Sequence, residues 1–159
     1  MIQPKTLAWS ILASSSLFLS TGSSTDLVTR ADSLFNIRAE GSRGQKAVMS
    51  PIQAAVTSYE RALESFPDSL SIHWKRLRAM HFMIQYVDHE DQYRFEIIEK
   101  SKRNAEASLS LASNICDKNI LEFGTTQQLA ERCNPYTVAR LYFWSAICWG
   151  LWSKIQEGI

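Results

Sequence analysis

One spacing constrains this chain more than any other feature. Ala55, Tyr59, Ala62 and Pro67 follow one another at steps of four, three and five residues. Steps of three and four place side chains on one face of an α-helix, and alanines on that face let a second helix pack closely. Pro67 ends the helix because it lacks a backbone N–H donor. The spacing therefore predicts a closely packed pair of helices.

The same steps recur farther along the chain, which indicates an internal repeat. The second set comprises Ala105, Leu109, Ala112 and, in place of the proline, Asp117. Small residues at these offsets are typical of the second helix of a tetratricopeptide repeat, and Trp74 with Leu77 fits the large positions of a first helix. Because Ala55 and Ala105 lie 50 residues apart instead of the usual 34, we expect an insertion around residues 86–100.

Apolar residues at helical spacing extend over most of the chain. They predict six helices, at about 26–40, 50–66, 71–87, 92–114, 127–132 and from 135 onward. The pattern predicts an all-α fold in which tetratricopeptide-like hairpins stack as a short solenoid. The connector 117–134 is expected to be ordered, because Leu121, Phe123 and Leu129 need burial.

Three of these helices begin with capping signals. Ser, Thr and Asn side chains accept hydrogen bonds from the first backbone N–H groups of a helix, and a Gln three residues later completes a capping box. The signals are Ser50 with Gln53, Thr125 with Gln128, and Asn134 followed by Pro135.

The first 24 residues have the composition of a secretory signal. Lys5 precedes an apolar run over residues 7–19, and small polar residues follow up to Ser24. This is the order of an export signal, and the run is short for a transmembrane helix. We therefore expect residues 1–24 to be a signal peptide and residues 25–159 to form the helical-repeat domain. An uncleaved membrane anchor is the alternative.

Charge and composition exclude some classes of partner. Seventeen basic and sixteen acidic residues leave a formal net charge of +1. Such a chain has no long-range field to attract a polyanion, so we expect no nucleic-acid partner.

The three cysteines of residues 25–159 have two different interpretations. Cys116 and Cys133 flank the connector and could form a disulfide across about 17 residues, worth roughly 3 kcal/mol. Cys148 lies in an apolar helix and is interpreted as a small core residue. No C-x-x-C pair is present and no histidine stands at ligand spacing from a cysteine, so we expect neither a metal nor a cofactor.

The chain carries no catalytic motif. G-x-S-x-G, the Walker loop, G-x-G-x-x-G and H-E-x-x-H are all absent, so the sequence predicts a protein that is not an enzyme. His81 could bind a ligand or a metal, but an imidazole at the edge of the core is the better interpretation.

The last helix is apolar almost all round. Its aromatic residues are the candidate binding residues, for an apolar small ligand or for a helix of a partner: Tyr142, Trp144, Trp149 and Trp152. The alternative is that they pack as core. Such a helix needs cover on several sides, so we expect that the chain continues in a longer protein or that a second subunit covers the helix.

These features resemble the T-component family of TRAP (tripartite ATP-independent periplasmic) transporter systems. The resemblance covers roughly residues 27–159 and depends on the export signal, the repeat helix at residues 50–67, and the W-x-A-x-x-x-G-x-W run at residues 144–152. It implies a periplasmic protein that associates with the substrate-binding protein of a transporter and assembles as an oligomer. Members are often lipoproteins, and because no cysteine follows the apolar run here, membrane attachment stays open.

Two other classes of function are weighed against this one. A generic tetratricopeptide scaffold for protein–protein interaction in the cell envelope needs only the repeat signatures. An all-helical enzyme would need a catalytic cluster built from distant residues, with His81 as its first candidate, and nothing in the sequence supports it.

Overall fold

The fold is entirely helical in the part of the chain that the computed structural model describes, residues 24–157. The seven helices there are α1 (Ser24–Asn36), α2 (Met49–Ser65), α3 (Leu70–Tyr86), α4 (Asp91–Cys116), α5 (Lys118–Phe123), α6 (Thr126–Arg132) and α7 (Pro135–Gln156). The prediction of an all-α fold is thus confirmed. The predicted signal peptide lies outside the described residues, except for Ser24, which begins α1.

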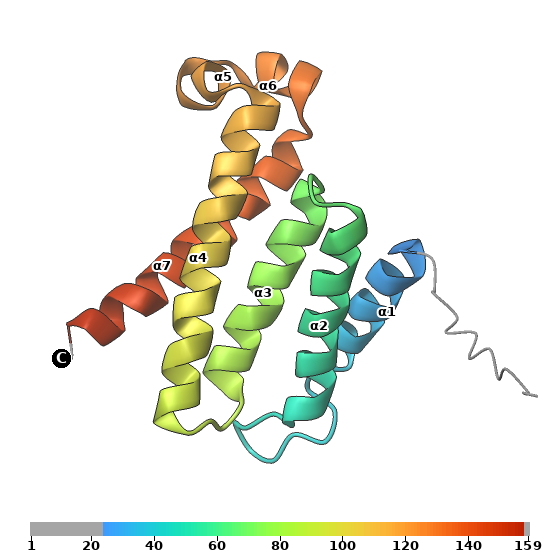
Figure 1. The fold of residues 1–159 in the computed structure, drawn as a ribbon, viewed down its shortest axis with the longest axis vertical. Coiled ribbons are helices and arrows are strands. Elements are labelled where there is room, and N and C mark those ends of the chain that lie inside the picture. Colours follow the sequence, from blue (N-terminus) through green and yellow to red (C-terminus); the bar gives the residue numbers. More distant parts are fainter. Residues whose placement is uncertain (1–23, 158–159) are drawn as a thin grey trace, which may run out of the picture.

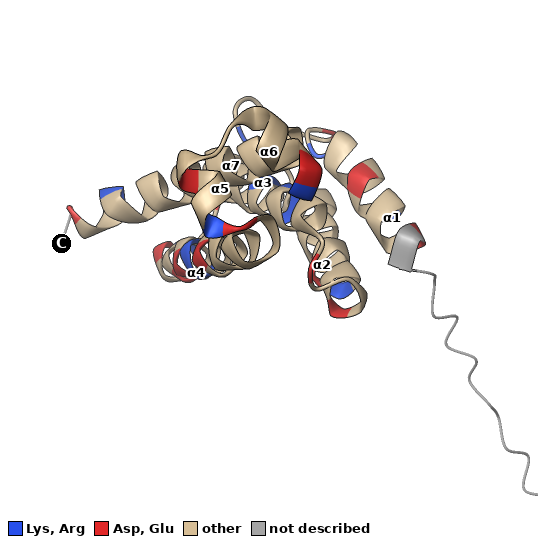
Figure 2. Cartoon of the chain, turned by 90° about the horizontal axis from the view of Figure 1, so that it is seen from above, with Lys and Arg blue, Asp and Glu red and all other residues tan. Residues whose placement is uncertain are grey.

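Helices α1 to α4 lie side by side, and α7 crosses behind α4 (Figure 1). Successive helices pack on each other from α1 to α4, and α7 packs on both α3 and α4. Seen from above, α2 and α4 lie on one side of α3, while α1 and α7 lie to either side of it (Figure 2). Helix α3 is therefore the central element that all the other long helices contact or approach.

Small residues lie where the helices approach most closely. The alanines at positions 55, 62, 105 and 112 have no exposed surface, and neither has Tyr59. Trp74 and Leu77 of α3 are buried, Leu109 is half-buried, and Pro67 is exposed in the turn after α2. The residues that the sequence assigned to repeat packing, apart from Pro67, thus lie wholly or partly in helix contacts.

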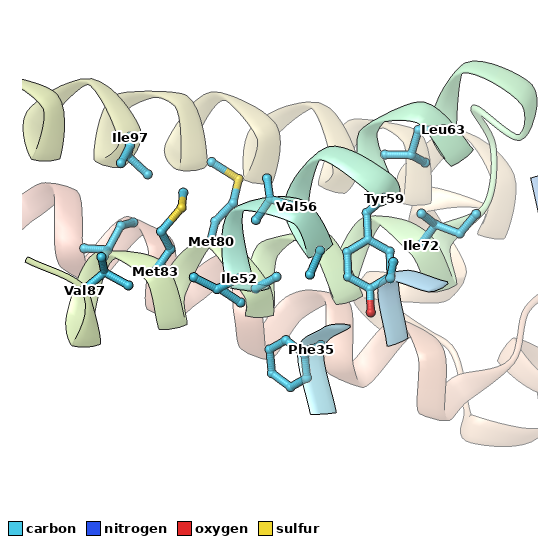
Figure 3. Close-up of a cluster of buried hydrophobic side chains, with 14 of the residues drawn as sticks. Phe35, Ile52, Val56, Tyr59, Leu63, Ile72, Met80, Met83, Val87 and Ile97 are labelled. Carbon is cyan, nitrogen blue, oxygen red and sulfur yellow. The ribbon is translucent and has the colours of Figure 1, made fainter. Parts of the chain in front are cut away.

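Two clusters of buried side chains form the core. The first lies between α1, α2, α3 and the start of α4, with the side chains of Ile52, Tyr59 and Met80 at its centre (Figure 3). The second lies between α3, α4 and α7 and includes Leu77 and Leu141. Full burial of one such Leu or Ile side chain contributes about 1.5–3 kcal/mol. The second cluster exists only because α7 returns to the α3–α4 hairpin.

The sequence places the N-cap of α2 at Ser50, two residues after the observed N-cap, and the predicted capping hydrogen bond is absent. The helix begins at Met49, Val48 is the N-cap residue, and no side chain caps the helix. Backbone pairing explains the shift, because the Ala47 N–H donates to the Tyr86 carbonyl at 2.7 Å and ties this segment to the end of α3. Ser50 therefore lies within the first turn of the helix.

The other two capping predictions are confirmed. Thr125 and Gln128 form a complete capping box on α6. The Asn134 side chain accepts a hydrogen bond from the Thr137 N–H at 3.1 Å, and Pro135 is the first residue of α7.

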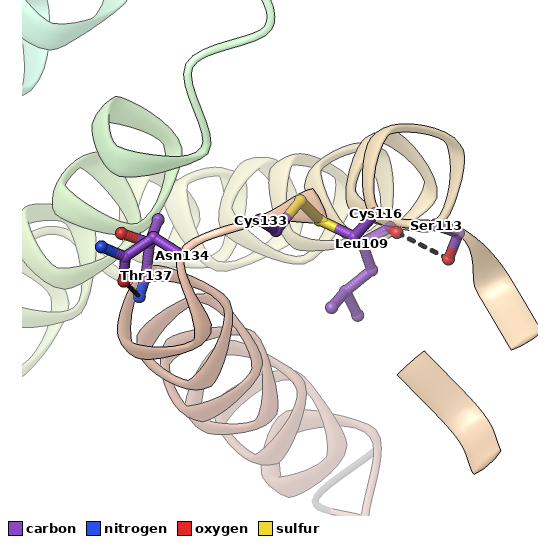
Figure 4. Close-up of a disulfide and its surroundings, with 6 residues drawn as sticks. All are labelled: Leu109, Ser113, Cys116, Cys133, Asn134 and Thr137. Carbon is purple, nitrogen blue, oxygen red and sulfur yellow. Dashed lines mark hydrogen bonds between the residues drawn. A yellow bond between two sulfur atoms is a disulfide. The ribbon is translucent and has the colours of Figure 1, made fainter. Parts of the chain in front are cut away.

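The connector between α4 and α7 is ordered by two short helices and a disulfide. Cys116 at the end of α4 is bonded to Cys133, and their Cα atoms are 5.5 Å apart (Figure 4). Asp117 reverses the chain with a positive φ of 69°, and its side chain accepts a hydrogen bond from the Asn119 N–H. The expectation that Phe123 is buried is wrong, because its side chain is 84% exposed at the tip of α5.

Within residues 24–157, no helix combines the length and the apolar character that a bilayer crossing requires.

Candidate binding surface

Helix α3 presents a column of large side chains at steps of four residues. Trp74, Arg78, Phe82 and Tyr86 follow this spacing, which places them on one face. The Arg78 guanidinium carbon lies 5.0 Å from the centroid of a Trp74 ring, and the rings of Phe82 and Tyr86 are 4.8 Å apart. The column therefore places one cation among three aromatic rings along the central helix.

Helix α1 adds a ring to this column, and the turn after it adds a second cation. The Arg78 guanidinium lies 3.9 Å from the centroid of Phe35, and Arg38 lies 4.2 Å from the same centroid. Arg38 also lies 5.1 Å from the centroid of Phe82 and donates a hydrogen bond to the Phe35 carbonyl at 2.9 Å. The Phe35 ring thus contacts two guanidinium groups, one from α3 and one from the turn that follows α1.

Helix α7 extends the arrangement on the opposite side of α3. The Arg140 guanidinium lies 4.7 Å from a Trp74 ring centroid and 4.0 Å from the centroid of Tyr136. Cations over aromatic faces at these distances are attracted by the ring quadrupole. The result is one arginine–aromatic row across three helices, in the order Arg38, Phe35, Arg78, Trp74, Arg140, Tyr136.

The cations of this row have no carboxylate partners. Among the ion pairs of the described residues, none includes Arg38, Arg78 or Arg140. Asp32 is the acid that acts on Arg78, and it is engaged by Lys75 at 2.6 Å and by the Tyr59 hydroxyl at 2.6 Å. All three arginines are half-buried, so water screens their charges incompletely.

Burial makes the charge on Arg78 costly. It lowers the pKa of the guanidinium below the ordinary value, while Tyr59 and Asp32 oppose this effect and Arg38 reinforces it. An arginine nevertheless stays protonated in proteins. The Nε atoms of Arg38 and Arg78 are buried without a hydrogen-bond partner. The row is therefore a strip of positive charge whose guanidinium groups form no ion pair among the described residues.

An open hollow of about 630 Å³ adjoins the row at Phe82. Its lining includes Gln85 and Tyr86 of α3 and Ala39, Gln45 and Ala47 of the α1–α2 connection. Tyr86 is 46% exposed there, which leaves an aromatic surface uncovered. The row and the hollow together form one surface, to which α1, α3 and α7 all contribute side chains.

A smaller cleft of about 260 Å³ lies between α2 and α4. Met80 and Met83 of α3 line it, and Lys100 and Glu60 pair beside it at 2.7 Å. Glu96 also lines the cleft and leaves it a net negative charge, so this cleft does not offer the unpaired cations of the row.

The aromatic residues that the sequence singled out in α7 are not gathered into one groove. Trp149 and Trp152 lie together, with ring centroids 5.7 Å apart, and Lys102 of α4 lies over both. The Trp152 indole N–H donates a hydrogen bond of 2.5 Å to Glu99. Trp144 lies on another face of the helix, against α3, and Tyr142 is 43% exposed. The Trp149–Trp152 pair, which packs on α4, and the Trp144 ring, which packs on α3, are therefore two separate contacts of α7.

His81 lies at the edge of the core. Its ring is half-buried with its centroid 5.5 Å from that of Trp144, and burial lowers the pKa of the imidazole. Within the part of the chain that the structure describes, no three potential ligands come together in a way that could hold a metal ion.

One further contact resembles catalytic geometry. The Ser108 hydroxyl lies 2.9 Å from Nδ1 of His73, whose Nε2 lies 2.8 Å from the Pro67 carbonyl. Ser108 has no exposed surface, so a substrate cannot reach its oxygen. This contact joins α3 to α4 as part of the packing.

No protein-family model, no curated protein and no solved structure matches this chain. The function proposed below is therefore based on the geometry of the arginine–aromatic row and the adjoining hollow.

Sequence reasoning missed the arginine–aromatic row, although a local signal was present. At three places an arginine follows an aromatic residue by three or four positions: Phe35 to Arg38, Trp74 to Arg78, and Tyr136 to Arg140. Each pair is an ordinary amphipathic contact by itself. Only the packing of α1 and α7 on α3 joins the three pairs into one row.

Proposed function

We propose that this chain is a non-enzymatic, helical-repeat binding protein that docks a peptide segment of another protein on the surface formed by α1, α3 and α7. The observation that carries the proposal is the arginine–aromatic row, in which three half-buried cations lack carboxylate partners. Unneutralised, partly desolvated charge costs free energy in an isolated protein, and a binding partner can recover that cost.

The packing supports a repeat-like scaffold. Helices α1 with α2 and α3 with α4 form successive pairs, and the buried alanines lie in both second helices. Val138 and Leu141 of α7 are buried at the same spacing as Trp74 and Leu77 of α3. In this interpretation α1, α3 and α7 are the first helices of three units, and first helices line the peptide groove of such stacks.

Two features support a location outside the cytoplasm. The Cys116–Cys133 disulfide is of the kind that persists in oxidising compartments. Residues 1–24 have the order of an export signal. The proposal is therefore an exported protein that acts in the periplasm or cell envelope.

The narrower form of the proposal is an accessory protein of a TRAP-type transporter that associates with the substrate-binding protein. Its support is the resemblance of residues 50–67 and 144–152 to the T-component family. Purification of the tagged full chain from cell envelopes should then recover a solute-binding protein. Failure to recover one leaves only the general scaffold, in which the partner is another envelope protein.

A site-specific photo-crosslinker tests the general proposal. We expect a photoreactive residue in place of Gln85, beside the hollow, to form an adduct with a discrete partner in envelope extracts. The matched control places the same photoreactive residue at Arg61, which is exposed on α2. Equal labelling from both positions, or none from Gln85, would overturn docking on this surface.

A further inference from the structure

We propose that the arginine–aromatic row takes an acidic peptide segment, whose carboxylates pair with Arg38, Arg78 and Arg140. This inference rests on the docking function proposed above and adds the chemistry of the partner. Its basis is charge complementarity, because no ion pair of the described residues includes the guanidinium groups of the row, and Asp32, the acid that acts on Arg78, is held by two other partners.

The one acid shown to act on the row, Asp32, is already occupied. Asp32 accepts from Tyr59 through one oxygen and from Lys75 through the other. Both contacts are 2.6 Å long, which leaves this carboxylate little capacity for a further strong partner. A carboxylate that neutralises the arginines must therefore come from outside this network.

The row is organised in advance for such a ligand. The rings of Phe35 and Trp74 are buried, and each is in contact with two guanidinium groups. Planar guanidinium groups held against rings lose little freedom on binding, and each can form two parallel hydrogen bonds to one carboxylate. Binding to prearranged groups costs less entropy than ordering them at the moment of contact.

The spacing of the cations fits an extended peptide. One ring stands between consecutive arginines, with Arg38 and Arg78 at 4.2 and 3.9 Å from the Phe35 centroid. Side chains on the same face of an extended chain are roughly 7 Å apart. Acidic residues at alternate positions of an extended segment can therefore reach successive guanidinium groups along the row.

Two other anionic partners fit less well. Nucleic acid is drawn by strong net charge, and this chain has a formal charge of +1. A flat membrane surface favours protruding lysines and arginines, whereas the three arginines here are half-buried among their rings. A narrow peptide that lies across α1, α3 and α7 can approach them.

The test compares two double variants of the full chain that remove the same charge from different surfaces. Arg38→Gln with Arg140→Gln alters the two ends of the row, and Arg61→Gln with Arg103→Gln alters exposed arginines of α2 and α4. The probes are short fluorescent peptides in which serine alternates with glutamate, glutamine or lysine. Fluorescence anisotropy gives the affinities, and thermal unfolding checks that both variants fold.

We expect the glutamate peptide to bind the unmodified chain and the control variant, and to bind the row variant roughly tenfold more weakly or worse. Should the row variant fail to fold, Arg38→Lys with Arg140→Lys keeps the charge but loses the planar fork, and a several-fold loss is then expected.

The contrary outcomes separate the two proposals. Equal or tighter binding of the glutamine or lysine peptide would overturn the acidic specificity and leave the docking function standing. Equal weakening in both double variants would also overturn the specificity of the row. If none of the three peptides binds, or if anionic vesicles or single-stranded DNA bind in preference, both proposals fail.

Discussion

The Tyr59 hydroxyl on α2 donates a hydrogen bond of 2.6 Å to Asp32 on α1, and the other oxygen of that carboxylate pairs with Lys75 on α3. Three helices thus meet at one acidic side chain. Burial, followed by the hydrogen bond to Asp32, raises the pKa of Tyr59 well above its ordinary value of 10.0. This junction fixes α1 against α3 and so sets the distance between Phe35 and Arg78.

Replacement of Tyr59 by phenylalanine should weaken this junction. The Tyr59→Phe variant keeps the buried ring but leaves Asp32 with one partner fewer. A hydrogen bond to a charged group is worth about 2 kcal/mol, so the free energy of unfolding should fall by about that amount. Urea unfolding followed by circular dichroism measures the loss. An unchanged midpoint would show that water replaces the phenol without cost.

The raised pKa of Tyr59 predicts a loss of stability at alkaline pH. The folded state holds the phenolic proton more tightly than the unfolded state does, so the stabilisation is complete below pH 10.0 and is lost as the pH rises above that value. Unfolding free energies measured between pH 9 and 11 should therefore fall more steeply in the unmodified protein than in Tyr59→Phe. Parallel curves for the two proteins would contradict the assigned cause.

Burial of His81 predicts an acid-sensitive fold. Because burial lowers the pKa of the imidazole, the unfolded state binds the proton more readily, and stability falls as the pH drops below the ordinary value of 6.5. The limit is about 1.4 kcal/mol per pH unit for one proton. His81→Phe keeps a ring against Trp144 and should flatten the unfolding curve between pH 7 and 5. His73, whose pKa burial also lowers, accounts for a remaining slope.

Loss of the disulfide should destabilise the chain by about 3 kcal/mol, the value for a loop of this length. In Cys133→Ser the segment of α5 and α6 loses its covalent tie to α4. Reductant supplies the matched comparison, since it should lower the stability of the unmodified protein to that of the variant and leave the variant unchanged. Identical unfolding free energies for the unmodified protein and Cys133→Ser without reductant would show that the disulfide adds no stability.

Overpacking at a buried alanine tests the close helix contacts. Ala105→Leu places a larger side chain where no surface is exposed, and it should cost about 1–3 kcal/mol. Ala107→Leu is the control, because Ala107 lies on the exposed face of the same helix and the change is nearly neutral there. Equal unfolding midpoints for the two variants would mean that α4 does not need a small residue at position 105.

Most of the secondary structure follows from the period of the apolar residues. The predicted helices at 50–66, 71–87 and 92–114 agree with α2, α3 and α4 within two residues, because long amphipathic segments carry many repeats of the period. Helix α5 was not predicted, since six residues are too few for a period to emerge. The predicted cap of α2 was wrong because Ala47 is hydrogen-bonded to Tyr86, a residue distant in sequence, and the helix begins at Met49, before Ser50.

The binding surface could not be predicted in the same way. Apolar periodicity identifies which face of a helix is buried, and it drew attention to the tryptophans of α7. It does not say which charged residues lie on the edge of that face or what they meet. The row depends on the juxtaposition of Arg38, Arg78 and Arg140 from helices that begin more than forty residues apart in the sequence.

The position of α7 has a consequence for the way the chain is made. Because α7 completes the second cluster, Leu77 and Ala105 cannot be fully buried until the 22 residues of α7 have left the ribosome. The α1–α2 hairpin can form early from local contacts, whereas the face of α3 that packs on α7 stays exposed until α7 is present. A nascent chain therefore exposes an apolar surface on α3 until α7 has been synthesised, and this surface is a site that a chaperone can bind.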